Sequence, residues 1–375
     1  MTKTVLITGG GGFIASHCSA LLLRHNYRVK ALDNLDPQIH GHDRRPPVYL
    51  DRRVELVLGD IRSPKTVRRA LADVDAVIHL AARVGVGQSM YEVADYTDVN
   101  GRGTAVLLEM MIERARRCPF DRLVVASSMS IYGEGLYRAA DGGLVADAER
   151  TARQLKRGIW DPLDDTGRSL KAVPTPEDKA PSMRSVYALS KYDQERLCLI
   201  VGEAYEIPTV ALRFFNVYGP HQALSNPYTG VLAIFAARLL NDRPPPLFED
   251  GEQRRDFVYV DDVAEACRLA LLSDAAVGHA LNVGSGASVS IKEAALLLAD
   301  ALGVPIEPEI TGECRIGDVR HCFPDIGRAR ALLGFQPRYS LAAGLKKLVG
   351  WLDGRVAVDR VGEARAALAA RGLTL

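Results

Sequence analysis

A tyrosine and a lysine near the middle of the chain are the residues whose types and spacing best suit chemistry. Tyr187 is the first and Lys191 the last residue of the run YALSK, so a helix would place both on one face. A tyrosine has a pKa of about 10, and its phenol acts as a base near neutrality only where a cation lowers that value. The Lys191 ammonium supplies such a cation, although Tyr-x-x-x-Lys alone is also a common solvent-facing pair.

Two serines provide the third group that this pair needs. Ser127 and Ser128 close an apolar run at 123–127 that reads as a strand. Active sites of open α/β sheets collect where parallel strands end. There the Ser128 hydroxyl can hydrogen-bond a substrate oxygen while Tyr187 moves a proton. Together with Lys191, these groups suit hydride transfer at a secondary alcohol.

A glycine turn near the N-terminus suits a pyrophosphate. Glycines fill positions 9 to 12 between a strand and a helix, and both Gly9-x-x-Gly12-x-x-Ala15 and Gly10-x-Gly12-x-x-Ala15 fit. Glycine lets a phosphate approach the backbone, and the helix N-terminus offers free N–H groups. Asp33 ends the next strand, where a carboxylate accepts from the ribose hydroxyls of an adenosine. With no arginine beside it, Asp33 favours NAD over NADP.

Alternating strands and helices must position these groups. Strand-like apolar runs at 5–8, 28–32, 54–58, 76–79, 123–127 and 209–215 alternate with helical patterns at 14–25, 64–71, 103–117 and 186–204. This alternation predicts an α/β fold with a doubly wound parallel sheet covered on both faces. Residues 134–182 interrupt it with a polar, proline-containing stretch, which predicts a long surface insertion. A peripheral helix is expected at 363–375.

The composition excludes several classes of protein. The 375 residues allow two domains or one large domain with a lobe, and 47% hydrophobic with 25% charged residues excludes wholesale disorder. The net charge of +1 gives no bulk attraction to nucleic acid or to an anionic membrane. No apolar run reaches about 18 residues, which predicts no membrane span.

Cysteine usage and the first residues indicate the compartment. The six cysteines are scattered without a C-x-x-C pair, so we expect a reduced, cytoplasmic enzyme with no metal site. The start, MTKTVLIT, reads as a strand and lacks the apolar stretch and cleavage site of a signal peptide.

Six motifs recur together in one order: TGGGGFI at 8–14, HLAA at 79–82, SSMSIYG at 127–133, Tyr187-x-x-x-Lys191, RFFNVYGP at 213–220 and RDFVYVDD at 255–262. In these the chain resembles the extended short-chain dehydrogenase/reductases, specifically the nucleotide-sugar epimerase/dehydratase family, over nearly its whole length. The resemblance implies a modified Rossmann domain with tightly bound NAD at 1–213, including the insertion. It also implies a smaller mixed α/β substrate domain at 214–375, from which some segments return to the first domain.

The resemblance carries functional residues with it. It implies a catalytic triad of Ser128, Tyr187 and Lys191. The implied cofactor contacts are Gly9, Gly12, Phe13, Ile14, Asp33, Asn34, Asp60, Ile61, Leu80, Ala81, Ala82, Asn100, Ser127, Tyr187, Lys191 and Phe214. The implied substrate contacts are Ser128, Asn216, Asn226, Phe248, Arg255, Arg315 and Asp318.

Chemistry supports the pyrophosphate role implied for Asn216, Arg255 and Arg315, since a diphosphate favours planar bidentate donors such as arginine. Asp318 matches a ribose contact, and Asn226 and Phe248 match contacts near the base. The resemblance also implies a homodimer formed through the helices at 103–117 and 186–204.

The residues after Ser128 narrow the reaction. Dehydratases of this family carry an Asp-Glu pair there, and decarboxylating relatives carry a glutamate at the second place, whereas this chain has Met129 and Ser130. A thioether neither donates nor accepts the proton that elimination needs. The remaining chemistry is transient oxidation at sugar C4 and re-reduction on the other face. This resembles the 4-epimerases of UDP-galactose and dTDP-L-rhamnose.

Other functions stay open at this stage. A net 4-dehydrogenase or reductase, epimerisation at another carbon, and a non-catalytic NAD-binding regulator fit the same fold. The sequence leaves the base of the nucleoside-diphosphate sugar (UDP-, dTDP- or GDP-linked) undetermined. It also leaves undetermined whether 134–182 forms a lid or a partner surface.

Overall fold

A seven-stranded parallel sheet forms the centre of the computed structural model, which describes residues 2–315 and 317–374. The strand order is β14-β9-β5-β4-β1-β2-β3, and every neighbouring pair is parallel. The strands are β1 (Thr4–Thr8), β2 (Arg28–Asp33), β3 (Glu55–Leu58), β4 (Ala76–His79), β5 (Arg122–Ser128), β9 (Thr209–Phe214) and β14 (Ala280–Val283). This order confirms the doubly wound α/β fold.

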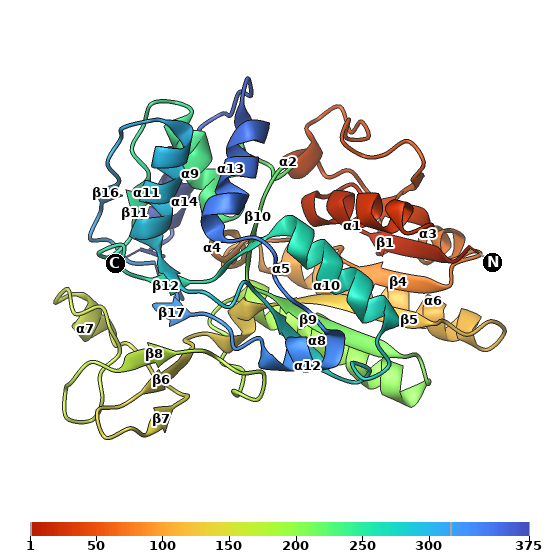
Figure 1. Ribbon diagram of the computed structural model, residues 1–375, viewed down its shortest axis with the longest axis horizontal. Coiled ribbons are helices and arrows are strands. Elements are labelled where there is room, and N and C mark those ends of the chain that lie inside the picture. Colours follow the sequence, from red (N-terminus) through yellow and green to blue (C-terminus); the bar gives the residue numbers. More distant parts are fainter. Residues whose placement is uncertain (1, 316, 375) are drawn as a thin grey trace.

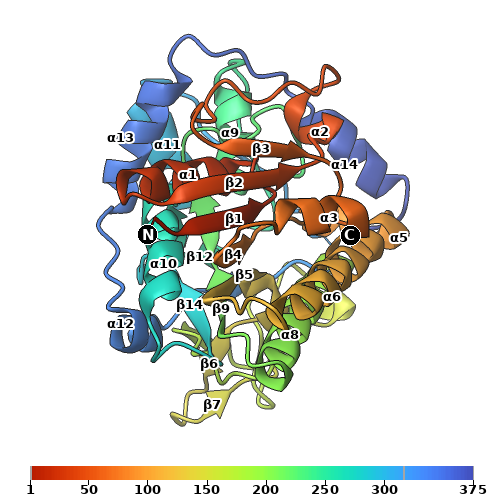
Figure 2. The ribbon, with the colours of Figure 1, turned by 90° about the vertical axis from the view of Figure 1, so that its right-hand side faces the viewer.

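Helices cover both faces of the sheet (Figure 2). One face carries α1 (Phe13–Arg24), α10 (Val260–Leu272) and α12 (Gly327–Leu333), and the other carries α3 (Pro64–Ala70), α6 (Gly103–Ala115) and α8 (Val186–Ala204). Alternate side chains of β1 enter the two cores: Val5 and Ile7 pack with the first helices and Leu6 with the second. This double burial explains why the central strands are uninterrupted apolar runs.

The second half of the chain builds a further core at the carboxyl end of the sheet. It lies among α9 (Val231–Leu239), α11 (Ile291–Leu302) and α13 (Leu341–Leu352), at the upper left of Figure 1. The short strands here are β10 (Asn216–Tyr218), β11 (Pro246–Leu247), β12 (Arg254–Arg255), β13 (Phe257–Tyr259), β15 (Val289–Ser290), β16 (Glu309–Ile310) and β17 (His321–Cys322). Because β14, α10 and α12 return to the large sheet, the division at residue 213 stays a prediction.

The insertion at 134–182 has structure of its own. It contains β6 (Leu136–Arg138), β7 (Leu144–Val145) and β8 (Lys171–Val173), which form an antiparallel sheet, and the helix α7 (Ala152–Leu155). It lies at the lower left of Figure 1, beside β17. Backbone hydrogen bonds from Gly135 to His321 and from Thr175 to Phe323, both 2.8 Å, attach it there.

Several short elements connect the larger ones. They are α2 (Pro37–His40), α4 (Val86–Ser89), α5 (Val93–Tyr96), the π-helical turn η1 (Thr97–Arg102) and the 3-10 turn η2 (Met129–Tyr132). The C-terminal helix α14 spans Val361–Ala369, so the helix expected at 363–375 ends early. Gly372 follows it with φ of 67°, a left-handed conformation that ends a helical path, and Leu375 lies outside the described residues. Within the described ranges, no helix is both long enough and apolar enough for a membrane crossing.

Candidate active site

Ser128 ends β5 at the carboxyl edge of the sheet. Its extended backbone (φ −146°, ψ 147°) makes it the N-cap of η2, and its hydroxyl accepts the Ser130 N–H at 3.2 Å. The Ser130 hydroxyl lies 3.0 Å from the same oxygen. The neighbouring Ser127 hydroxyl is buried and has no hydrogen-bond partner among the described residues. The strand therefore ends in one buried hydroxyl without a partner among the described residues and one that a neighbour orients.

Tyr187 and Lys191 lie in the first turns of α8. Ser185 caps the helix by accepting the Ala188 N–H at 3.1 Å, and the Tyr187 N–H donates to the Ser89 hydroxyl of α4 at 3.0 Å. Burial raises the pKa of the Tyr187 phenol, and the nearby Ser128 side chain opposes that rise. The structure thus places the predicted base near the predicted serine, on two different elements.

Lys191 is 4% exposed, and burial lowers the pKa of its ammonium to about 8. The ammonium donates to the Gln194 Oε1 at 2.6 Å. The next residue, Glu195, forms a buried two-pronged ion pair with Arg213 of β9 at 2.9 and 2.7 Å, which fixes α8 against the sheet. The Lys191 charge, one helical turn after Tyr187, is therefore held in one place.

Gln194 is a residue of this site that sequence reasoning did not identify. Its amide nitrogen donates to the Thr104 hydroxyl at 2.8 Å and to the Ala81 carbonyl at 3.2 Å, and it lies 3.2 Å from the His79 Nε2. Burial and the Lys191 charge lower the pKa of His79 to about 3, so the imidazole is neutral. Gln194 thus ties the lysine to α6 and to the end of β4. Its position one helical turn after Lys191 was the available signal.

The glycine turn has the geometry of an anion cradle. Gly9 has φ of +68°, and a Cβ there would come within 3.0 Å of the Ala81 backbone. Gly12 precedes α1, whose N-terminus receives no side-chain cap, so the first N–H groups around Phe13 and Ile14 stay available to a phosphate. These features fit the pyrophosphate of a dinucleotide.

Asp33 lies directly against this turn. Its carboxylate accepts the Gly11 N–H at 2.9 Å and the Leu35 N–H at 2.7 Å. A carboxylate offers about four acceptor positions, so two remain for ribose hydroxyls. The acidic group expected from the sequence is thus oriented by the same backbone that forms the cradle.

Other predicted cofactor positions surround the strand ends. Asn34 donates to Asp60 at 3.2 Å. Arg62 donates two hydrogen bonds to the same carboxylate and lowers its pKa to about 2. The Asn100 side-chain oxygen accepts the Arg83 N–H, and its side-chain nitrogen donates to the Arg83 carbonyl and to the Ser190 hydroxyl. Partly exposed Leu80, Ala81 and Ala82 follow β4, and buried Ile61 and Phe214 lie beyond β3 and at the end of β9.

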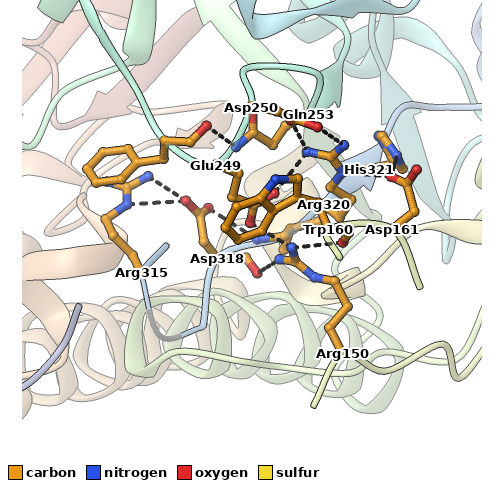
Figure 3. Close-up of polar contacts among 12 residues, drawn as sticks. Arg150, Trp160, Asp161, Glu249, Asp250, Gln253, Arg315, Asp318, Arg320 and His321 are labelled. Carbon is orange, nitrogen blue, oxygen red and sulfur yellow. Dashed lines mark hydrogen bonds and ion pairs between the residues drawn. The ribbon is translucent and has the colours of Figure 1, made fainter. Parts of the chain in front are cut away.

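The predicted substrate contacts fall into two groups. The Arg315 guanidinium lies 4.5 Å from the Phe248 ring centroid and bonds Asp318 at 2.8 Å (Figure 3). The Arg255 guanidinium lies 3.9 Å from Asp318 and donates to the backbone carbonyls of Arg254, Val319 and Arg320. The Asn216 side-chain oxygen is buried without a partner among the described residues. Asn226 instead accepts from Gln38 and from the Tyr228 N–H.

A short helix connects the catalytic and substrate groups. Ser89 of α4 holds the Tyr187 backbone, while Val86 and Gly87 of α4 line a cavity of about 10 Å³ with Arg315 and Asp318. One turn of helix therefore lies between the candidate base and the candidate diphosphate contacts.

Comparisons with known proteins agree with this geometry. The model of the NAD dependent epimerase/dehydratase family matches residues 5–151 and 166–284. A dTDP-L-rhamnose 4-epimerase from Burkholderia thailandensis is 36% identical over 353 residues, covering 93% of this chain and 95% of the relative.

Solved structures of similar fold carry the expected ligands. A UDP-glucose 4-epimerase from Thermotoga maritima with UDP-glucose is 29% identical with a TM-score of 0.75, covering 93% of this chain and 98% of that one. A UDP-glucuronic acid 4-epimerase from Bacillus cereus, in complex with UDP-glucuronic acid and NAD, is 27% identical with a TM-score of 0.75 and the same coverage.

Proposed function

Because the chain belongs to the NAD dependent epimerase/dehydratase family, we propose that it is a nucleotide-sugar 4-epimerase whose proton transfers use Ser128, Tyr187 and Lys191. The observation that carries the proposal is the placement of Tyr187. The Ser128 side chain lies near enough to its phenol to oppose the rise in the phenol's pKa, and the tyrosine backbone is held by α4, which also lines a cavity with Arg315 and Asp318. The enzyme is an NAD-dependent isomerase of nucleotide sugars.

The chain's own residues carry the acid–base part of the reaction. NAD held at the glycine turn and Asp33 would supply the two-electron oxidant for C4. Tyr187 removes the proton of the C4 hydroxyl and gives it back, while the Ser128 hydroxyl holds the substrate oxygen. Burial works against a phenolate at Tyr187, so the fixed Lys191 charge is needed to make that base available.

The residues after Ser128 favour epimerisation over elimination. The Ser130 hydroxyl is engaged with Ser128 at 3.0 Å. Met129 packs beside Ile131 and Tyr132 and has no ionisable group. Neither position offers the acid and base that loss of water from the sugar requires. A ketone formed at C4 is therefore expected to be reduced again rather than to lose water.

Arginines support the binding of a diphosphate. Arg255 and Arg315 carry planar donors beside Asp318, and Asn216, whose side-chain oxygen has no partner among the described residues, lies at the start of β10. We propose that these groups hold the pyrophosphate while the sugar turns. A UDP- or dTDP-linked hexose is the expected substrate, and the dTDP-linked 6-deoxyhexose of the relative from Burkholderia thailandensis is the first one to test.

A substrate screen tests this function. The purified protein is incubated with UDP-, dTDP- and GDP-sugars without added NAD, and the configuration at C4 is followed by NMR. We expect interconversion of C4 epimers and retention of deuterium placed at C4. Accumulation of reduced nicotinamide in proportion to consumed sugar would instead indicate a net dehydrogenase.

Tyr187→Phe removes the proposed base. We expect at least a hundredfold loss of kcat with the bound NAD retained, because general acid–base catalysis contributes about 10²–10⁴ in rate. Undiminished epimerisation would refute the role of this tyrosine.

A further inference from the structure

A buried ionic cluster joins the insertion to the loops that carry the predicted substrate contacts (Figure 3). At its centre is Arg150, between β7 and α7, whose side chain is 5% exposed. Its guanidinium donates to Glu134 at 3.1 Å, to Glu249 at 2.6 Å and to the Asp318 carbonyl at 2.9 Å. A single side chain of the insertion thus reaches two loops of the substrate region.

Glu249 shows that the first of these loops is tightly fixed. It follows Phe248 directly, its side chain is 2% exposed, and its backbone has φ of 55°, a left-handed conformation for a non-glycine residue. Such a strained residue persists only where its surroundings hold it. Here Arg150 holds its carboxylate from one side and Arg320 from the other at 2.9 Å.

The second loop presents the pair that faces the substrate. Arg150 holds the Asp318 backbone, and the Asp318 carboxylate accepts from Arg315 at 2.8 Å. The Arg315 guanidinium in turn lies over the Phe248 ring, at 4.5 Å from its centroid. Arg150 therefore contacts both loops, and the two loops contact each other through Phe248 and Arg315.

The charges make this arrangement sensitive to Arg150. Glu134 and Glu249 are both buried, and their shared cation is Arg150. Removing one partner of a buried ionic contact leaves uncompensated charge, which costs far more than an exposed pair gains. Without Arg150 the Asp318 carbonyl and Glu134 would lose this donor and Glu249 would keep only Arg320, so Phe248 and Asp318 would be less firmly held.

We propose that Arg150 is a positioning residue for the nucleoside-diphosphate part of the substrate site, and that the insertion at 134–182 is a fixed part of that site. This inference rests on the proposed function, because it takes Phe248, Arg315 and Asp318 as substrate contacts. A lid that opens in each turnover is a different arrangement, since opening would break every buried contact of Arg150.

Calorimetric titration of the NAD-containing protein with UDP and with dTDP tests the proposal. For Arg150→Met we expect at least tenfold weaker binding of whichever diphosphate binds the wild type, about 1.4 kcal/mol at 25 °C. Arg150→Lys keeps the charge but loses the planar fork, so a smaller loss is expected. Exposed Arg153→Met in α7 is the matched control and leaves binding unchanged.

Kinetics of the same variants distinguish positioning from general damage. We expect KM for the nucleotide sugar to rise with the diphosphate dissociation constant, while kcat and the NAD content stay within about twofold. Equal losses of NAD and kcat, or unchanged diphosphate binding in Arg150→Met, would overturn the proposal. If Arg150→Met does not fold, Arg150→Lys and Glu249→Gln carry the same test with the same expected direction.

The binding measurement needs no turnover, so the two hypotheses fail separately. If UDP or dTDP binds and Arg150→Met weakens it, but no sugar is epimerised, the proposed function fails and the role of Arg150 stands. If the wild type epimerises sugars and Arg150→Met binds UDP and dTDP as the wild type does, only the role of Arg150 fails.

Discussion

Lys191 carries a buried charge that the proposed catalysis needs but that lowers the stability of the folded protein. Burial lowers the pKa of this ammonium from 10.5 to about 8. Below pH 8 the folded and unfolded chains both carry the charge. Between pH 8 and 10.5 only the unfolded chain keeps the proton, so unfolding takes up a proton and stability rises with pH. Neutral pH is therefore where holding this charge costs the folded protein most.

Lys191→Met tests this cost. We expect the free energy of unfolding of the variant, relative to the wild type, to fall by about 2–3 kcal/mol between pH 7 and pH 10, since the wild type alone gains stability over that interval. Urea unfolding at several pH values measures the difference. A difference independent of pH would contradict a buried ammonium with a lowered pKa.

Gln194→Leu tests the support of the same charge. The amide oxygen accepts from the ammonium at 2.6 Å, and losing a hydrogen bond to the charged form lowers the pKa of Lys191 further. We expect kcat of the wild type to fall above about pH 8, and the fall in Gln194→Leu to begin at a lower pH. The pH profile of kcat is the measurement.

Exposed Gln336→Leu is the matched control and should keep the wild-type profile. A loss of rate in Gln194→Leu with an unmoved alkaline limb would show that Gln194 supports only the fold.

Residue types and spacing identify some of the candidate site and miss the rest for a physical reason. Tyr187 and Lys191 share one helix, so their spacing alone relates them. Gln194 and Ser89 act through contacts across elements, to Thr104 and to the Tyr187 backbone, and only the packed structure relates these. The same holds for Arg150, which reads in the sequence as one of many charged residues in a polar stretch.

At the scale of elements, the glycine turn makes a sharp prediction because its glycines differ. A Cβ on Gly10 would come within 2.4 Å of the Ala31 Cβ, which the fold cannot accept, whereas one on Gly12 meets only the Gly9 carbonyl at 3.1 Å. For Gly12→Ala we expect a folded protein with at least tenfold weaker NAD retention, because the methyl group enters the space in front of the helix N-terminus.

NAD content after gel filtration and thermal unfolding check this prediction. Gly350→Ala, in the exposed part of α13 with nothing within 4 Å of the new Cβ, is the control. It should keep NAD and gain about 0.5–1 kcal/mol of stability. Full NAD retention in Gly12→Ala would contradict the hypothesis that the pyrophosphate binds at this turn.

Elements with strong periodicity were predictable and short ones were not. The strand expected at 123–127 is Arg122–Ser128, and the one at 28–32 is Arg28–Asp33. The strands of the insertion have two or three residues each, too few for a period of two to show. The helix expected at 103–117 continues a path that starts at Val93 and passes through the π-helical η1. Polar residues of that turn, including Asn100, interrupt the apolar pattern, so the sequence did not reveal where the helical path begins.

At the scale of the whole molecule, the site lies where two cores meet. Ser128 and Tyr187 belong to the carboxyl edge of the large sheet, and Arg315 and Phe248 belong to loops of the second core. Crevices outside the carboxyl ends of parallel strands are where open α/β sheets bind ligands. The cofactor is therefore expected to lie on the sheet, with the substrate reaching it from the second core.

The outer face of α8 extends this argument to a second copy of the chain. Leu189, Asp193, Arg196 and Ile200 are all exposed and recur at helical spacing, so they share one stripe; Leu189 is 54% and Ile200 53% exposed. A two-fold axis through this stripe would bring Asp193 of one copy toward Arg196 of the other between the apolar ends. Self-complementarity of this kind is what an isologous dimer interface requires.

We therefore expect a homodimer that Ile200→Glu converts to monomers, because the substitution places a carboxylate against the apolar Leu189 of the second copy and removes apolar contact. Light scattering with gel filtration gives the mass of each variant. Leu296→Glu on α11, also partly exposed, is the control and should stay dimeric. The monomer should keep its bound NAD, since the glycine turn and Asp33 lie on β1, α1 and β2 rather than on α8. A wild-type protein that already elutes as a monomer would show that this stripe is free surface.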